Sequence, residues 1–407
     1  MERFFTDPNT LKRFRSGPLG SHVDQFANDL FGLGYTRKTI RYHLRIVDHF
    51  GHWLKSRRRN TTDITDEDVR RYVDQRGCVR NGDASAIMRM VELLRKRGIV
   101  RTKAGGVLTP VQEVIQDFSC YLQQERALAL PTITNYRRYA SAFLRARFGD
   151  GKLDLSLLTA ENVIDFVRIR AGAARSEAIK NVTHALRSFL AYARCRGLIS
   201  LNLAAAVPRV ANWWLSTIPK SLPRADVVRV LKSCDRRTAL GRRDYAILLL
   251  LARLGLRASE VGLLTLEDID WDGGRITVHG KGGKPCQLPL PADVGEAIAT
   301  YVCKGRPQAA TRAVFVRAQA PLCGFLNPRN IGTVVKRALA RAGVKSPRKG
   351  AHQLRHALAC QMLRHGASLV EIGQVLRHES PHTTAIYAKV DFASLQPLAQ
   401  PWPRRAK

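Results

Sequence analysis

The sequence has no pair of cysteines in a Cys-x-x-Cys spacing, although eight cysteines occur in its 407 residues. Zinc sites and the disulfide frameworks of small secreted domains both depend on closely spaced cysteines, so the scattered arrangement argues against either. Scattered cysteines are typical of a reducing compartment, which predicts a cytoplasmic protein. The eight residues are Cys78, Cys120, Cys195, Cys234, Cys286, Cys303, Cys323 and Cys360.

The chain also lacks a long apolar segment. Its longest apolar run, at residues 246–252, is far shorter than the roughly 20 residues with which a helix crosses a bilayer. Residues 1–7 include charged side chains and have no apolar core of the kind found in a secretory signal. The run at 246–252 therefore predicts a buried helical segment rather than a membrane span.

Acidic residues are scarce relative to basic ones. The chain has 33 Asp and Glu against 67 Lys and Arg, a formal net charge of +34. Copies of such a protein repel one another unless a polyanion neutralises them, and nucleic acid is the commonest such partner. Ribosomal and membrane-surface proteins are also basic, but ribosomal proteins usually carry the charge in short tails, whereas here it is spread over amphipathic segments. The charge predicts a nucleic-acid-binding protein, and the length predicts two or three domains.

A repeat occupies the first half of the chain. Residues 64–73, Ile-Thr-Asp-Glu-Asp-Val-Arg-Arg-Tyr-Val, match residues 158–167, Leu-Thr-Ala-Glu-Asn-Val-Ile-Asp-Phe-Val, at a constant offset of 94. An amphipathic helix is predicted before each match, at 39–54 and 132–148, and each following helix ends in Arg-x-Arg-Gly. Order and spacing favour duplication over a chance alignment of two helical bundles. We therefore expect two copies of one four-helix unit, at 20–105 and 108–208, after a tail at 1–19.

The pattern changes beyond a proline-containing linker expected at 209–221. Residues 275–290 alternate apolar and polar side chains around Gly280-Lys281-Gly282-Gly283, which predicts a β-hairpin with a glycine-rich turn. The expected fold class is mainly α with a small antiparallel β-sheet, in a domain at 222–390 followed by a tail at 391–407. Apolar spacing predicts helices in this domain at 224–231, 242–254, 328–342, 353–365, 369–376 and 381–390.

Four side chains in the last domain suit phosphoryl transfer without a metal or cofactor. Arg257 in Gly-Leu-Arg-Ala-Ser-Glu and Arg355 in His-Gln-Leu-Arg-His can clamp the oxygens of a phosphodiester. Tyr387, nine residues after His378, has a phenol that can attack phosphorus if a base or a cationic field assists it. Lys281, on the hairpin turn, can protonate a leaving oxygen. Each residue alone has an ordinary structural explanation, so the combination carries the prediction.

This combination resembles the tyrosine recombinase (phage integrase) family, which includes the Xer proteins and Cre. The resemblance is close over 222–390 and looser over 108–208, which is similar to the family's core-binding domain. It implies a C-shaped clamp around double-stranded DNA recombination sites and a tetramer on DNA. Carried over by position, it implies Tyr387 as the nucleophile that leaves a 3′-phosphotyrosine, Arg257 and Arg355 as the phosphate clamp, Lys281 as the general acid, His352 as the base, His378 as a further phosphate donor, and Glu260 as a brace behind the site.

Two features depart from the family pattern. Arg377 stands where most members have glycine before the histidine, and the unit at 20–105 is absent from minimal two-domain members. We interpret that unit as an additional DNA clamp, with a protein-interaction module, for instance for a partner recombinase, as the alternative. The side chains expected to contact DNA are Arg37, Lys38, Arg41, Arg45, Arg137 and Arg138.

Three other functions compete with integration or transposition of a mobile element. A type IB topoisomerase shares the chemistry but relaxes DNA as a monomer. A Xer-type recombinase would resolve replicon dimers, and a DNA-binding regulator would have a decayed site. Every catalytic position is filled, which argues against the regulator, and the tail residues Leu395, Leu398 and Trp402 favour assembly of protomers. A DNA-bound recombinase would be found with the nucleoid in the cytoplasm.

Overall fold

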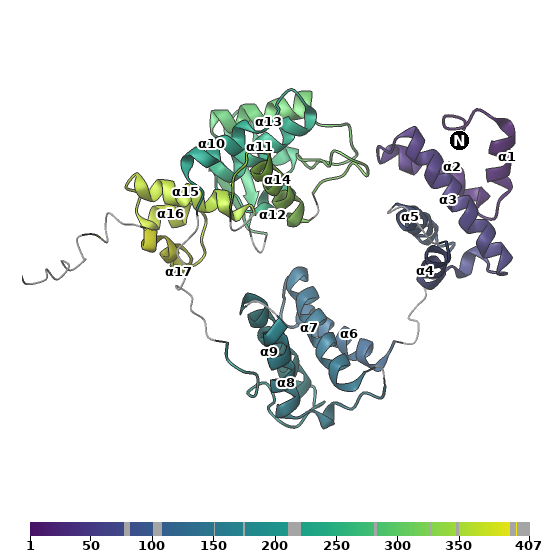
Figure 1. The fold of residues 1–407 in the computed structure, drawn as a ribbon, viewed down its shortest axis with the longest axis horizontal. Helices are drawn as coiled ribbons and strands as arrows, with labels where there is room; N and C mark the ends of the chain where they lie inside the picture. Colours follow the sequence, from purple (N-terminus) through teal and green to yellow (C-terminus); the bar gives the residue numbers. More distant parts are fainter. Residues whose placement is uncertain are drawn as a thin grey trace, which may run out of the picture. The chain divides into compact units, whose positions relative to one another are not determined.

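The computed structural model describes residues 1–76, 82–100, 108–149, 151–173, 176–210, 221–280, 283–325, 327–346, 350–390 and 396. These are mainly helical, with one small antiparallel sheet (Figure 1), which confirms the expected fold class. The chain divides into two compact units, residues 103–214 and a unit built from residues 1–102 and 215–407. The linker expected at 209–221 and the tail at 391–407 lie almost entirely outside the described residues, as does Lys281.

The amino-terminal segment forms a helical bundle with its own hydrophobic core. Its longest helix, α3, buries Ile40, Leu44 and Val47 against the neighbouring helices α2 and α5 and leaves its basic side exposed. The 3.6-residue period of an α-helix separates these two faces. The helices are α1 (Pro8–Ser16), α2 (Gly20–Gly32), α3 (Arg37–Ser56), α4 (Asp66–Gln75) and α5 (Asp83–Lys96), with a 3-10 turn at Thr61–Asp63.

The second unit has a similar series of helices around a separate core, in which α7 packs on α6 and α9. In both segments the repeated sequence forms a helix that begins after an N-cap Thr and follows a 3-10 turn. The helices are α6 (Pro110–Gln124), α7 (Leu130–Phe148), α8 (Ala160–Ala173) and α9 (Ser176–Cys195), with a 3-10 turn at Leu155–Leu157.

The repeated sequence has a local physical cause in helix capping. The hydroxyl of Thr65 accepts the backbone N–H of Asp68, whose carboxylate accepts the backbone N–H of Thr65. Thr159 and Asn162 exchange the same pair of bonds. Such reciprocal bonds satisfy donors that the first turn of a helix leaves free. Positive φ values of +68° at Gly98 and +70° at Gly197 fit the predicted helix ends.

The elements that follow residue 221 pack around α11. This helix is buried along most of its length, as its apolar run predicted. Helix α11 packs on α13 and α15, and α12 packs on α14. Neither α13 nor the short strand β1 was anticipated from the sequence. The elements here are α10 (Arg224–Lys232), α11 (Ala239–Arg253), α12 (Ala258–Leu263), a 3-10 turn at Leu266–Asp268, β1 (Ile269–Asp270), β2 (Arg275–His279), β3 (Pro285–Pro289), α13 (Ala292–Lys304), α14 (Pro328–Arg341), α15 (His352–Arg364), α16 (Leu369–Val375) and α17 (Pro381–Thr384).

The predicted hairpin is present as β2 and β3, and β1 extends it to a sheet of order β1-β2-β3. In its register Ile276 lies opposite Leu288 and Val278 opposite Cys286. Ile276 and Val278 are buried in the main core of this segment, which anchors the base of the hairpin. The described strands on either side of residues 281 and 282 are therefore anchored in the core through β2.

The helix expected at 381–390 is wrong in part. The α-helix ends at Thr384, and residues Ala385–Val390 continue as a tighter 3-10 helix. Residues three apart lie above one another in a 3-10 helix, and here Thr384 and Tyr387 are both buried. The tighter winding therefore directs both side chains to the interior.

Candidate active site

Arg257 lies at a junction between two helices. It is the N-cap of α12, and the carboxylate of Glu260, three residues on, accepts its backbone N–H at 2.8 Å. The preceding turn needs glycine, because Gly255 has a φ of +58° and a Cβ there would lie 2.7 Å from a methyl carbon of Leu376. The cap from Glu260 and the close packing of Gly255 against Leu376 together position the backbone of Arg257.

Glu260 is a buried carboxylate, 2% exposed, that pairs with two arginines. The guanidinium of Arg257 donates to it at 2.7 Å and that of Arg377 at 2.9 Å. Burial alone would raise the pKa of Glu260, but the hydrogen bonds from Arg257 and the charges of both arginines outweigh it and hold the pKa below its usual value. The carboxylate therefore remains ionised and braces both guanidinium groups.

Arg355 is 4% exposed and projects from α15 towards the same place. Its guanidinium donates to the backbone carbonyls of Gly255 and Leu376. Burial, with the positive charges of Arg257 and Arg377 nearby, lowers the pKa of Arg355 to about 10. The group is still protonated at neutral pH, and this crowding of positive charge favours an anion.

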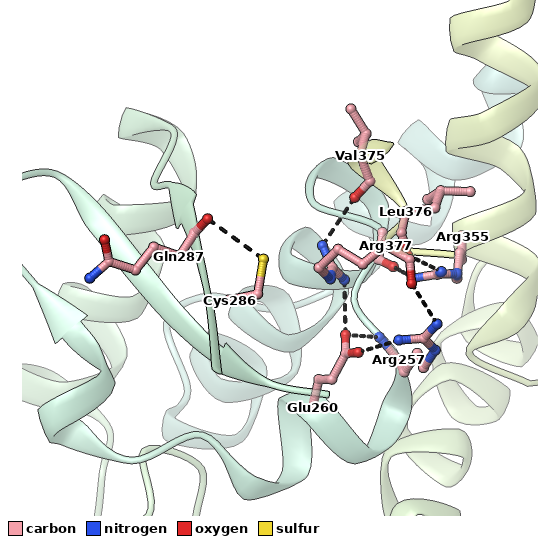
Figure 2. Close-up of polar contacts among 9 residues, drawn as sticks. Arg257, Glu260, Cys286, Gln287, Arg355, Val375, Leu376 and Arg377 are labelled. Atoms are coloured by element: carbon pink, nitrogen blue, oxygen red, sulfur yellow. Dashed lines mark hydrogen bonds and ion pairs between the residues drawn. The ribbon is translucent and has the colours of Figure 1, made fainter. Parts of the chain in front are cut away.

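The C-terminal end of α16 accepts hydrogen bonds from both Arg257 and Arg355. Helix α16 ends with Arg377 at a φ of +54° and with bonds from the N–H of His378 to the carbonyl of Gly373 and from the N–H of Arg377 to the carbonyl of Gln374. This is the Schellman arrangement, in which the left-handed position usually holds glycine. The carbonyl of Arg377 accepts the guanidinium of Arg257 at 3.0 Å. Figure 2 shows the three guanidinium groups gathered around this turn.

His378 leaves the turn with its ring against α17. Its Nδ1 lies 2.7 Å from the hydroxyl oxygen of Thr384. Burial, followed by the charges of Arg355 and Arg257, lowers the pKa of His378 to about 4. The imidazole is therefore neutral at physiological pH and can donate a hydrogen bond without adding charge.

The low pKa of His378 predicts pH-dependent stability. The unfolded chain takes up this proton near the ordinary histidine pKa of about 6.5, whereas the folded chain stays neutral at this ring until about pH 4. The unfolded state binds more protons in that window, so the free energy of unfolding should fall as pH falls through it. We expect the melting temperature of His378→Asn to fall less than that of the wild type over this range. Equal losses in the two proteins would contradict the prediction.

Tyr387 is 1% exposed and packs in a small cluster with Ile372 and Leu376. Its hydroxyl oxygen lies 2.7 Å from Nδ1 of His356. Burial raises the pKa of the phenol, and the charge of Arg355 offsets only part of that effect. Without a base, the phenol would stay protonated at neutral pH.

The structure brings four of the predicted residues together: Arg257, Glu260, Arg355 and His378. Tyr387 lies in the 3-10 helix Ala385–Val390. Its hydroxyl contacts His356, for which the sequence suggested no role. His352 is exposed at the start of α15, with its ring centroid 6.1 Å from that of His356.

Sequence reasoning missed two side chains of the site, His356 and Thr384, and the contact made by a third, Arg377. His356 lies four residues after His352, which is a helical spacing and was the available signal. Thr384 lies in the short segment before the tyrosine, and no sequence pattern marks it. Arg377 was noted only as a departure from the usual glycine, and its bond to Glu260 joins residues 117 positions apart.

The predicted DNA-contacting residues lie on two separate units. Arg37, Lys38 and Arg45 are exposed on α3. Arg41 instead donates to the carbonyl of Phe4, and its guanidinium lies 5.7 Å from the ring centroid of Phe5. This contact packs the amino-terminal segment onto α3, so we leave Arg41 out of the proposed DNA surface. On α7, Arg137 and Arg138 are both exposed.

No described helix is long and apolar enough to cross a membrane. No group of three or more His, Cys, Asp or Glu side chains suited to a metal ion occurs in the part of the chain that the structure describes.

Comparison with protein families matches both halves of the chain. Residues 220–394 match the phage integrase family. Residues 23–96 and 115–197 each match the SAM-like N-terminal domain of phage integrases. These two matches coincide with the two copies of the repeat.

Individual proteins show the same relationship. The integrase/recombinase y4rA of Sinorhizobium fredii is 46% identical over 410 residues, covering 100% of both chains. Tyrosine recombinase XerD of Mycobacterium tuberculosis is 31% identical over 300 residues, covering 69% of this chain and 94% of XerD.

Solved structures share the fold at lower identity. XerH bound to its difH substrate in a post-cleavage complex is 19% identical with a TM-score of 0.55, over 73% of this chain and 91% of XerH. A lambda integrase tetramer bound to a Holliday junction is 16% identical with a TM-score of 0.52, and the match covers 74% of this chain and 86% of the lambda integrase chain. Similarity over the full length of a relative, with both domain types matched, shows that the chain belongs to the phage integrase family and is a tyrosine recombinase, an enzyme that cuts and rejoins DNA.

Proposed function

We propose that the chain is the site-specific recombinase of a mobile element, and that it cleaves DNA through a 3′-phosphotyrosine formed by Tyr387. The observation that carries this proposal is the convergence at the end of α16. The guanidinium groups of Arg257 and Arg355 reach the carbonyls of Arg377 and Leu376, and His378 follows on the same turn (Figure 2). The convergence supplies charge and hydrogen-bond donors where a phosphodiester would be held.

In the proposed reaction, the phenolic oxygen of Tyr387 bonds to the scissile phosphorus as the bond from phosphorus to the 5′-oxygen breaks. Lys281 gives a proton to that oxygen, which leaves as a 5′-hydroxyl. Arg257 and Arg355 turn from their partners within the protein to the non-bridging phosphate oxygens, and His378 donates a further bond to the phosphate. Attack of a 5′-hydroxyl on the phosphotyrosine reverses these steps and rejoins the strands.

We assign the base to His356 in place of His352. The Nδ1 of His356 already lies within hydrogen-bond distance of the Tyr387 hydroxyl, and geometry is the first requirement of a general base. The raised pKa of the buried phenol makes such a base necessary. His352, exposed at the N-terminus of α15 near Arg355, is then placed to donate to the phosphate.

We further propose that four copies assemble on two recombination sites. The lambda integrase of the Holliday-junction complex is a tetramer, which supports this assembly for a chain with the same fold. A type IB topoisomerase would need no second site. Resolution of replicon dimers is the alternative role within the family, and XerD is a relative that supports it.

A suicide substrate tests this function directly. Duplexes taken from the DNA that flanks the gene are each nicked beside a candidate cleavage site, so that the released fragment diffuses away. We expect a covalent protein–DNA adduct, mapped by mass spectrometry to a 3′-phosphate on Tyr387. A plasmid with two sites should recombine, and one with no site should stay supercoiled. No adduct on any such duplex would overturn the proposal, and relaxation without a site would favour a topoisomerase.

We also propose that the amino-terminal unit is a second DNA clamp that arose by duplication. Each copy of the repeat matches the same SAM-like domain, and both carry exposed arginines on their long helix. On α3 these are Arg37 and Arg45, with Lys38 between them on the exposed side. The domain boundaries that follow from this proposal are 20–105, 108–208 and 222–390.

Salt dependence of binding tests the second clamp. Each lost phosphate contact should lower the slope of log affinity against log salt by about 0.9, so we expect the triple variant Arg37→Gln, Lys38→Gln and Arg45→Gln to lower it by between about 2 and 3. The matched control, Arg70→Gln, Arg71→Gln and Lys96→Gln, removes equal charge from side chains paired with Glu67 and Glu92. Equal slopes in the two triple variants would favour a protein-interaction module.

A further inference from the structure

Arg377 is unusual in three ways for a side chain at the end of a helix. It has a φ of +54°, where residues other than glycine are uncommon. Its side chain is only 12% exposed. Its Nε is buried and has no hydrogen-bond partner among the described residues. A strained backbone and an incompletely paired buried guanidinium persist only where the surroundings hold them, which points to a role in the site.

The contacts of Arg377 join it to Arg257 twice. Its guanidinium donates to the carboxylate of Glu260 at 2.9 Å, and the same carboxylate accepts Arg257 at 2.7 Å. Its backbone carbonyl accepts Arg257 at 3.0 Å. A second donor, to the carbonyl of Val375 at 3.1 Å, holds the guanidinium over Glu260, as Figure 2 shows.

We propose that Arg377 is a positioning residue that keeps Glu260 paired, so that Arg257 can turn its guanidinium from that carboxylate to the scissile phosphate. This inference rests on the proposed function, because it supposes that a phosphate enters beside Arg257.

The physical reason is the cost of leaving a buried charge unpaired. Glu260 is 2% exposed, so a carboxylate abandoned by the Arg257 side chain would lose its ion pair away from water. With Arg377 in place, the carboxylate keeps one guanidinium throughout. Without Arg377, Glu260 would hold Arg257 back and weaken its grip on the phosphate.

Charge balance agrees with this role. The three guanidinium groups of Arg257, Arg355 and Arg377 crowd one carboxylate, and this crowding contributes to the low pKa of Arg355. A phosphodiester attacked by a phenolate carries two negative charges in its transition state. Three arginines and Glu260 leave two positive charges beside the phosphate, in addition to the charge of Lys281, and this excess of positive charge favours the transition state.

The first test separates cleavage from binding in the full-length protein. Arg377→Gly removes the guanidinium and suits the backbone at this φ, so the helix end should still form. We expect adduct formation on saturating suicide substrate to slow about 10- to 100-fold, as for other partners that orient a ligand-binding group, with DNA affinity unchanged. Arg377→Lys, which keeps a charge beside Glu260 but also the backbone strain, should recover part of the rate. Arg364→Gln, a charge change at an exposed residue of α15, should match the wild type.

A double-mutant cycle identifies the partner through which Arg377 acts. Glu260→Gln removes the charge that would hold Arg257 back while keeping an acceptor for the backbone N–H. Adding Arg377→Gly to Glu260→Gln should therefore slow cleavage little further, although each change alone slows it. Wild-type rates in Arg377→Gly, or losses that multiply in the double variant, would overturn the proposal. Absence of any adduct with the wild-type protein would instead mean that the proposed function has failed.

Discussion

Replacing Tyr387 with phenylalanine should abolish covalent adduct formation and leave DNA binding intact. The change removes only the phenolic oxygen, so the ring still fills the cluster formed with Ile372 and Leu376. No other group can supply the oxygen that bonds to phosphorus in the proposed reaction. Gel-shift titration measures binding, and the suicide substrate measures the adduct on the same DNA.

Tyr245→Phe provides the matched control for this prediction. Tyr245 lies on α11, where the guanidinium of Arg236 is 4.9 Å from its ring centroid, and its ring packs against the main core. This variant should form adduct at the wild-type rate. An adduct that persists in Tyr387→Phe would show that a different residue is the nucleophile.

A second pair of variants distinguishes the phosphate-clamp role of Arg355 from the general-acid role of Lys281. Arg355→Lys keeps a positive charge but loses the planar fork that reaches two carbonyls, so cleavage should fall on the order of 10²–10³-fold. Lys281→Ala should lose on the order of 10²–10⁴ in cleavage rate, the usual contribution of a general acid. Single-turnover cleavage at saturating DNA gives both numbers.

A substrate with sulfur at the 5′-bridging position distinguishes these two roles. A thiolate leaves without protonation, so this substrate should restore cleavage in Lys281→Ala and give little benefit to Arg355→Lys. The opposite pattern, with rescue of the arginine variant alone, would show that the two roles are wrongly assigned.

Local sequence rules predicted most of the helices and the elements that carry the site. The repeat at 64–73 and 158–167 was found from the sequence, and the structure gives its physical cause, because Thr65 and Thr159 each form reciprocal bonds with the residue three positions on. The hairpin of β2 and β3 was predicted by alternation, whereas the capping of α12 by Glu260 was found only in the structure. Family membership, inferred first from motif spacing, is confirmed by the comparisons with known proteins.

Other elements escaped those rules for physical reasons. Strand β1 has two residues and forms only because Ile269 and Asp270 pair with β2. The 3-10 winding of Ala385–Val390 accompanies burial of Tyr387 against residues from other helices, while the sequence there is equally compatible with an α-helix. Weak local preferences give way to tertiary packing in segments this short.

The sequence by itself determined which chemistry is present: two arginines, a hairpin lysine, histidines and a tyrosine, at spacings that local structure can support. Only the tertiary structure decided how they pair. The contact between His356 and Tyr387 spans 31 positions and the one between Glu260 and Arg377 spans 117, so no helical or strand period predicts either. Burial in the folded chain then raises the pKa of Tyr387 and lowers that of His378. Burial is a property of the packed fold, because it depends on every segment that excludes water from the site.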